Sequence, residues 1–318
     1  MRRMLSCVLL GITTAAPCIG AQDQSAALAN LSELSRRGQL PQLIQSADSL
    51  LADAKLTPAD RGIVLTYLGH AYQQGGDFPK ATAYYEKALA IVERDGQHPS
   101  EYATTLGALA TLYAEMGQTD TAKHVLIRSI HVFESESDHA GAAMIWNDLA
   151  TIAAGRRSRR EAHKCIARSM AESHVASNLT PDEIAALTAT QASIAELDGD
   201  PRTAIADYQR SLALWKQSYE DQHPQTGWLY VLLGGAYLQA GDLADARVTT
   251  NRGLILLEAS SGRQSPRFLA AELAYSKVLD ASGAHDEASR FRAEAEAGLN
   301  TSPGRQQAHG EISISALR

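Results

Sequence analysis

Three histidines are spaced in a way that raises the question of a metal site. His124 and His131 lie seven residues apart, and His163 follows further along the chain. A zinc ion needs ligands that converge to about 2.1 Å from one point, whereas seven helical residues span about 10 Å. The spacing therefore argues against a shared ion, and the sequence predicts neither a metal nor a cofactor.

A dense basic run, RRSRR at residues 156–160, offers a second kind of chemistry. Arginine binds anions in bidentate geometry, so the run is a candidate site for an anion or an acidic partner. The simpler interpretation is a solvated turn, because exposed charge runs usually face water. Cys165, next to Lys164, is a candidate activated thiol, although a buried structural cysteine is the more common role.

Short sequence motifs of catalysis are missing. The chain has no phosphate-binding loop, no GxGxxG after a strand, no HExxH, no GxSxG and no CxxC pair. Catalytic residues that only folding brings together need no local motif, so this absence bears on local signatures alone. We expect a protein that is not an enzyme.

The composition is that of a folded, acidic protein. Its 318 residues include 29 Lys+Arg and 36 Asp+Glu, a formal net charge of −7, and 45% are hydrophobic. A net-negative chain is not attracted to nucleic acid or to an anionic membrane surface. The apolar content is too high for a disordered chain, so we expect a packed core and no nucleic-acid partner.

The first 21 residues have the three parts of a secretory signal peptide. Arg2 and Arg3 are followed by an apolar stretch at residues 4–16, then by Pro17 and a small residue, Ala21. The apolar stretch is shorter than the roughly 20 residues that a membrane span needs. We expect cleavage after Ala21 and a periplasmic or secreted protein without a membrane span.

Cleavage after Ala21 would leave Cys165 as the remaining cysteine, so the exported chain would have no internal disulfide bond. A lipid anchor at Cys18 is the alternative. Pro17 directly before that cysteine makes a poor lipobox and disfavours it.

Small residues recur with a period of about 42 residues and organise the remainder of the chain. The aligned alanines are Ala81, Ala122, Ala162, Ala204, Ala246 and Ala288. Another small residue lies twelve positions before each alanine, and a third lies seven positions after it. A turn glycine lies between the first two in five copies, and Arg157 replaces it in the third. This pattern predicts two helices per unit that cross closely where the side chains are small.

Prolines and capping residues predict where these helices begin. Proline suits the first turn of a helix and costs about 3 kcal/mol in its interior. The prolines at predicted starts are Pro58, Pro99, Pro181, Pro224 and Pro266 for first helices, and Pro41, Pro79 and Pro201 for second helices. Thr57, Thr180, Asp200 and Ser265 stand where caps are expected.

These residues resemble the tetratricopeptide repeat. The segment Leu68-Gly69-x-x-Tyr72, followed by Ala81-x-x-x-Tyr85-x-x-Ala88, matches the signature of that family. The period exceeds the usual 34 residues, and His-Pro opens two units, as in the longer kinesin-light-chain type of repeat. The resemblance implies an all-α fold, an α-solenoid of stacked helix-turn-helix repeats that forms a right-handed superhelix.

The signal pattern and the repeat period together give the expected organisation of the chain. We expect a signal peptide at 1–21, a capping helix pair at 22–58, six repeats at 59–298 and a disordered tail at 299–318. Within the tail, Ile312 and Ile314 alternate with serines as in a short strand.

The resemblance also implies a binding groove lined by the first helices, at positions i, i+3, i+7 and i+10 of each. These are Ile63, Thr66, His70, Gln73, Thr104, Gly107, Thr111, Ala114, Met144, Asn147, Thr151, Ala154, Ala186, Ala189, Ser193, Glu196, Trp228, Val231, Gly235, Leu238, Ala270, Leu273, Lys277 and Asp280. Lys277 is the one basic residue among them, which argues against the clamp that holds a terminal carboxylate in some family members.

From this set we predict six peptide-binding residues. They are His70, Gln73, Thr111, Asn147, Thr151 and Trp228. Amide and hydroxyl groups bond a peptide backbone, and Trp228 would anchor an apolar side chain or pack against a neighbouring unit. The predicted function is an exported, non-enzymatic scaffold that binds a protein or peptide. Self-assembly, also within a larger envelope assembly, and an accessory role for an enzyme on another chain are the alternatives.

Overall fold

The computed structural model describes residues 19–52, 56–219 and 223–301, and within these ranges all regular structure is α-helical. The helices are α1 (Ile19–Arg36), α2 (Leu40–Leu51), α3 (Pro58–Gln74), α4 (Phe78–Asp95), α5 (Pro99–Glu115), α6 (Thr119–Ser135), α7 (His139–Gly155), α8 (Arg159–Val175), α9 (Pro181–Asp198), α10 (Pro201–Ser218), α11 (Pro224–Ala240), α12 (Leu243–Ser261), α13 (Pro266–Ala281) and α14 (His285–Thr301).

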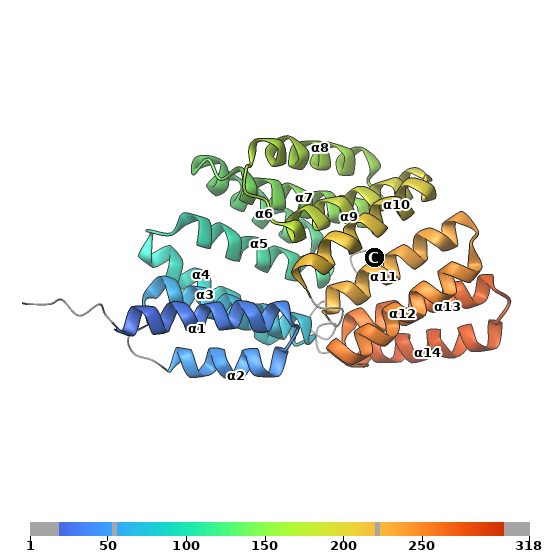
Figure 1. The fold of residues 1–318 in the computed structure, drawn as a ribbon, viewed down its shortest axis with the longest axis horizontal. Helices are drawn as coiled ribbons and strands as arrows, with labels where there is room; N and C mark the ends of the chain where they lie inside the picture. The colour runs from blue at the N-terminus through green and yellow to red at the C-terminus, as the bar shows by residue number, and fades with distance from the viewer. Residues whose placement is uncertain (1–18, 53–55, 220–222, 302–318) are drawn as a thin grey trace, which may run out of the picture.

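The helices pair into antiparallel hairpins that stack into a curved array (Figure 1). In each of the six units the first helix contacts its own second helix, and in the first five units it also contacts the first helix of the next unit. The odd-numbered helices α3 to α13 therefore form the inner layer, and the even-numbered helices form the outer layer. The all-α solenoid predicted from the repeat is confirmed.

Small residues form the contact between the two helices of each unit. All six repeated alanines are fully buried, with 0% of their surface exposed. At Gly69, a Cβ atom would lie 2.6 Å from the ring of Tyr85 on the partner helix, so the position accepts no larger side chain. Close packing of this kind is what the spacing of small residues predicts.

In three units the third small residue also makes a hydrogen bond between the paired helices. The hydroxyls of Ser129, Ser169 and Ser211 donate to the carbonyls of Ala103, Ala143 and Ala185, each at 2.7 Å. The serines are completely buried, so the bond satisfies a group that would otherwise be costly to desolvate.

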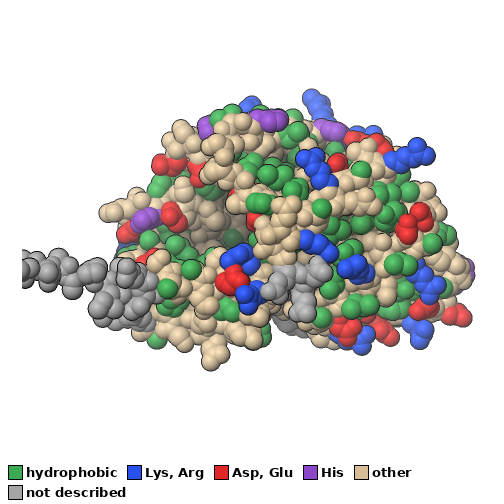
Figure 2. Space-filling model, in the orientation of Figure 1, with side chains coloured by type: hydrophobic (Ala, Val, Ile, Leu, Met, Phe, Trp, Pro, Cys, Tyr) green, Lys and Arg blue, Asp and Glu red, His purple; other side chains and the backbone are tan. Residues whose placement is uncertain are grey.

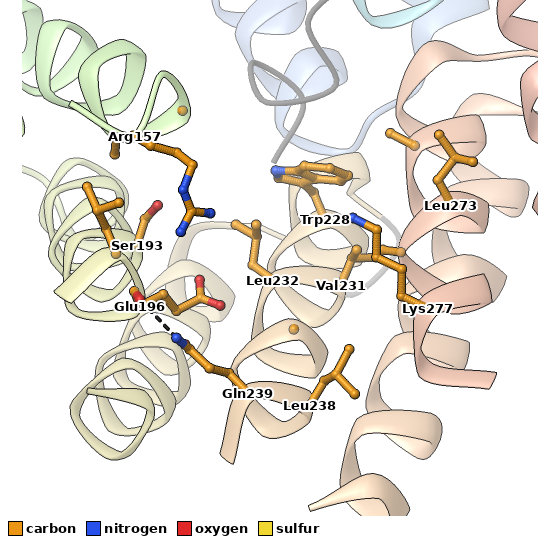
Figure 3. A pocket seen from close by; sticks show the side chains of 16 residues that line it. Arg157, Ser193, Glu196, Trp228, Val231, Leu232, Leu238, Gln239, Leu273 and Lys277 are labelled. Carbon is orange, nitrogen blue, oxygen red and sulfur yellow. Dashed lines mark hydrogen bonds between the residues drawn. The ribbon is translucent and has the colours of Figure 1, made fainter. Parts of the chain in front are cut away.

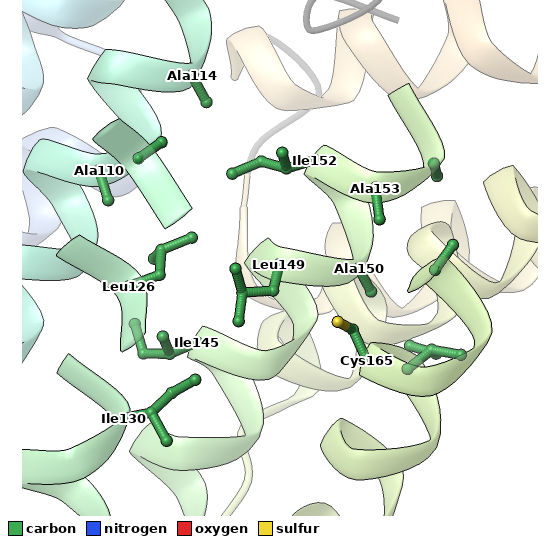
Figure 4. Packing of buried hydrophobic residues seen from close by; sticks show 14 of the residues in the cluster. Ala110, Ala114, Leu126, Ile130, Ile145, Leu149, Ala150, Ile152, Ala153 and Cys165 are labelled. Atoms are coloured by element: carbon green, nitrogen blue, oxygen red, sulfur yellow. The ribbon is translucent and has the colours of Figure 1, made fainter. Parts of the chain in front are cut away.

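Larger side chains fill the space between these crossings. In the middle units Leu126, Ile145, Leu149, Ala150 and Cys165 belong to one buried apolar cluster (Figure 4). Burial raises the pKa of the Cys165 thiol above its ordinary value. An activated thiolate would need a lowered pKa, so the structure supports the structural role for this cysteine.

The predicted helix starts are confirmed. Proline occupies the first or second position of all eight helices where the sequence places it, as in α3 and α4. Thr57, Asp200 and Ser265 each accept a hydrogen bond from the backbone amide three residues later. Thr180 and Glu183 form the reciprocal pair of a capping box.

The two ends of the array approach each other across the inner layer. A Cβ atom on Gly76, in the turn of the first unit, would lie 2.7 Å from Cδ of Pro266 at the start of α13. Beside this contact, Arg267 forms an ion pair with Glu115 of α5 at 3.5 Å. The array therefore curves through enough of a turn for α13 to return to α3 and α5, and the inner side appears as a hollow in the space-filling view (Figure 2).

The boundary predicted for the C-terminal tail is wrong by three residues. Helix α14 continues to Thr301, and Leu299 is buried against the last unit, because it extends the apolar side of that helix. Residues 302–318 lie outside the described residues, as do residues 1–18 of the predicted signal peptide and the Cys18 alternative. None of the described helices is both long enough and apolar enough to span a bilayer.

We expect an enlarged side chain at an aligned alanine to disrupt the array. Ala204→Leu inserts three carbons at a fully buried position of α10, so it should lower the free energy of unfolding by about 1–3 kcal/mol. Chemical denaturation followed by circular dichroism measures this. Ala206→Leu, at an exposed position of the same helix, should stay within about 0.5 kcal/mol of the native chain. Equal effects of the two variants would contradict the proposed packing.

Arg157 adopts the left-handed backbone conformation of the glycines that it replaces, with φ of 57° against 80° at Gly76. That conformation costs a residue with a Cβ atom about 1 kcal/mol. Arg157→Gly should therefore raise the free energy of unfolding by about 0.5–1 kcal/mol. Arg156→Gly is the matched control, since Arg156 lies outside the left-handed region and should lose stability. A loss of stability in Arg157→Gly would show that the arginine side chain stabilises the turn.

Candidate binding groove

Four cavities follow one another along the inner layer of first helices. The N-terminal cavity, of about 420 Å³, lies between α3 and α5. The central cavity, of about 280 Å³, is lined mainly by α5, α7, α9 and α11, and the C-terminal cavity, of about 270 Å³, by α7, α9, α11 and α13. A small fourth cavity of about 20 Å³ lies where α3 meets α13.

The groove positions predicted from the family resemblance line these cavities, apart from Gly107, Met144 and Asp280. Trp228 and Leu232 of α11 border both the central and the C-terminal cavity, so these two cavities adjoin. Together they make a continuous groove on the inner side of the last five units.

The central cavity brings together four of the six predicted residues: Thr111, Asn147, Thr151 and Trp228. The hydroxyls of Thr111 and Thr151 donate to helix carbonyls at 2.8 and 3.0 Å, and the Thr151 hydroxyl also bonds the Thr190 hydroxyl at 3.0 Å. Each hydroxyl oxygen has two lone pairs, so both threonines can still accept a bond from a ligand. Asn147 is 5% exposed, and its Oδ1 has no hydrogen-bond partner. A buried amide oxygen without a partner is costly and is rare in native structures.

Trp228 has both of the roles considered from the sequence. Its side chain packs against Ala270 of the next unit and also forms the wall between the two cavities. An aromatic ring that is held by its neighbour and partly open to a cavity provides a rigid apolar contact surface.

His70 and Gln73 lie away from the other four, around the small cavity near Glu115 and Arg267. Gln73 is buried and accepts a hydrogen bond from the Tyr85 hydroxyl at 2.8 Å, so its side chain is part of the core. His70 also borders the N-terminal cavity and bonds Gln74 at 3.1 Å. Burial, together with the charge of Arg267, lowers the pKa of His70 to about 4 and keeps it neutral at pH 7.

The basic run divides between two roles. Arg156 pairs with Asp120 at 2.9 Å and Arg159 with Asp198 at 2.8 Å, so each joins its unit to a neighbouring one. Arg157 instead extends into the C-terminal cavity (Figure 3). The groove positions predicted from the sequence did not include Arg157, because they lie on helices and this residue lies in a turn. The sequence did show that Arg157 replaces a repeated glycine.

The C-terminal cavity is apolar in the middle and charged at its border (Figure 3). Trp228, Leu232 and Leu273 supply apolar surface, and Arg157 with Lys277 supplies positive charge. The carboxylate of Glu196 also borders the cavity and accepts a hydrogen bond from the Tyr208 hydroxyl at 2.8 Å. This combination suits a short extended segment with apolar side chains and charges of both signs.

The predicted groove positions also left out Asp148 of the central cavity, because it lies one residue after the predicted position Asn147. Burial raises the pKa of its carboxyl to about 7. Among the described residues no group of three or more His, Cys, Asp or Glu side chains is arranged to hold a metal ion. The groove therefore presents hydrogen-bonding groups, apolar walls and isolated charges.

Comparisons with known proteins agree with this architecture. The family model described as "Tetratricopeptide repeat" matches residues 60–135 and 183–259. These segments are tetratricopeptide repeats. The units between and beyond them follow the same helix pairing and period in the structure.

Solved structures share the fold at low sequence identity. The Rap conjugation gene regulator of the plasmid pLS20, in complex with the Phr* peptide, has a TM-score of 0.68 and 13% identity over 96% of this chain and 82% of that one. NprR in complex with its cognate peptide NprX has a TM-score of 0.64 and 15% identity over 88% and 79%. The hetero-tetramer Cut9-Hcn1 of the APC/C has a TM-score of 0.60 and 17% identity, over 89% of this chain and 49% of that one. The comparison with curated proteins returned no match.

The raised pKa of Asp148 gives a pH-dependent prediction. Its folded value of about 7 lies above the ordinary 3.8, so stability should fall as pH rises from about 4 to 7 and then level off. The substitution Asp148→Asn removes this loss. The free energy of unfolding of the variant should therefore exceed that of the native chain by about 2–4 kcal/mol at pH 8, and by much less at pH 4. Denaturation at both pH values measures this, with Asp286→Asn on the exposed start of α14 as control. A difference independent of pH would contradict the assignment.

Proposed function

We propose that this protein is an exported, non-enzymatic scaffold that binds an extended peptide, or an extended segment of a partner protein, in the groove. The observation that carries the proposal is the continuity of the central and C-terminal cavities along successive first helices. Stacked units hold this surface rigid, so little conformational entropy is lost when a ligand binds.

The groove chemistry supports a peptide as the ligand. Asn147 offers an amide with an unpaired oxygen, and Thr111 and Thr151 offer hydroxyls, at the spacing of successive first helices. These groups bond backbone amides and carbonyls without regard to side-chain type. Trp228 and Leu232 offer apolar contacts between them, which gives an anchor for one or two side chains.

Two proteins of similar fold, the Rap regulator of pLS20 and NprR, were solved with bound peptides, and this likeness favours a peptide ligand here. Export is proposed from the sequence of residues 1–21.

Self-assembly is the second candidate function. It is favoured by exposed apolar side chains on outer helices, Ile127 of α6 and Val248 and Ile255 of α12, which are 47%, 69% and 59% exposed. Light scattering separates the two functions, because self-assembly gives a mass that rises with concentration when no partner copurifies.

We expect groove variants to lose partner capture. Asn147→Ala and Trp228→Ala should each weaken capture in a crosslinking pull-down from the native compartment by about tenfold or more, because they remove central contacts of a buried interface. Ile255→Ala on the outer layer is the matched control and should capture normally. Circular dichroism should show unchanged helicity in all three variants. Normal capture by both groove variants would refute the proposed site.

A further inference from the structure

The described chain ends next to the wall of the C-terminal cavity. In the last turn of α14, a Cβ atom on Gly298 would lie 2.7 Å from the side chain of Leu269, and Leu299 joins the same apolar cluster. Ala270 and Leu273, which follow on α13, line the cavity. The chain therefore leaves α14 beside the first turns of α13, and a different side of α13 borders the groove.

Residues 302–318 are long enough to enter that cavity. An extended chain spans about 3.3 Å per residue, so these 17 residues cover up to about 56 Å. The wall from Ala270 to Lys277 measures about 10 Å along α13, at 1.5 Å per residue. The first half of the segment can serve as a linker while the last eight residues lie along the groove.

The sequence at the chain end matches the chemistry of the cavity. Residues 311–318 read Glu-Ile-Ser-Ile-Ser-Ala-Leu-Arg, so in an extended conformation Ile312 and Ile314 point to the same side. Glu311 is opposite in charge to Arg157 and Lys277 at the border of the cavity. The Arg318 side chain is likewise complementary to the carboxylate of Glu196, and the apolar residues suit the surface around Trp228.

The backbone of Arg157 is a further indication that its side chain is needed there. Five of the six units have glycine at this turn position, whereas this unit keeps an arginine in the left-handed conformation, with φ of 57°. Strained backbone of this kind is found where a side chain has a role that offsets its cost.

We infer that the C-terminal segment 311–318 binds in the C-terminal cavity of its own molecule and that a partner must displace it. This inference rests on the proposed peptide-binding function of the groove. A tether of about ten residues gives an effective concentration of about 1 mM. A segment that binds as a free peptide with a Kd of about 100 μM would then occupy the groove most of the time and weaken a competing ligand about tenfold.

The test uses the full chain and a fluorescein-labelled synthetic peptide of residues 308–318. The triple variant Ile312→Asp, Ile314→Asp and Leu317→Asp should vacate the cavity, so fluorescence anisotropy should give it a Kd for the probe about tenfold lower than that of the native chain. The control places the same three charges in the linker, as Ser302→Asp, Gln306→Asp and Gln307→Asp, and should match the native chain. Equal binding by the three chains, or no binding by any, would overturn the inference.

A second variant tests the location. Arg157→Glu in the triple-variant background should weaken probe binding at least fivefold, and because the residue lies in an exposed turn its helicity should be unchanged. Unaltered probe binding would overturn the pairing of Glu311 with Arg157. Light scattering tests a last alternative. If the native chain forms a dimer and the triple variant does not, the segment binds in the groove of a second copy, and the inference of binding within one molecule is wrong.

The outcomes also separate this inference from the proposed function. If the probe fails to bind while Asn147→Ala and Trp228→Ala lose partner capture, only the tail inference is wrong. If the probe binds as expected while partner capture is unaffected, the groove serves the tail and the proposed partner site is wrong.

Discussion

Close contact between paired helices at small, fully buried residues is the constraint on which the remainder of the structure depends. A helix pair with alanine, glycine or serine at three aligned positions brings its backbones near enough that a serine hydroxyl reaches the opposite carbonyl, as Ser129 does at 2.7 Å. The same geometry repeats in each unit and fixes how one unit is placed on the next. The groove is a consequence of that repetition, because six similar steps generate one curved inner surface.

The ends of the array add a constraint that no single unit contains. Pro266 lies against Gly76, and Arg267 pairs with Glu115, so the last unit contacts the turn of the first unit and the end of α5 in the second. Burial, together with the neighbouring His70 and Arg267, lowers the pKa of His223 to about 3, so this histidine is neutral at pH 7. These contacts limit the freedom of a solenoid to open and close, and they stabilise the shape of the groove.

Within the groove, the polar and apolar parts have separate roles. The central cavity carries amide and hydroxyl groups that can bond any peptide backbone, whereas the C-terminal cavity combines an apolar floor with charges that can select particular side chains. Trp228 belongs to both and couples them. A ligand that spans both cavities would therefore be held by its backbone at one end and recognised by its side chains at the other.

The sequence by itself determined the helices, their pairing and the inner face of each first helix. Ala81 and its five counterparts, the prolines at helix starts and the caps act over a few residues or within one unit, so their physical effect can be read locally. Tertiary structure decided what depends on the summed curvature of all units. It separated His70 and Gln73 from Asn147, brought Arg157 from a turn into a cavity, and placed Arg267 against Glu115, 152 residues away in the chain. A small rotation per unit, accumulated over six units, sets these distances, and no local pattern of residues specifies it.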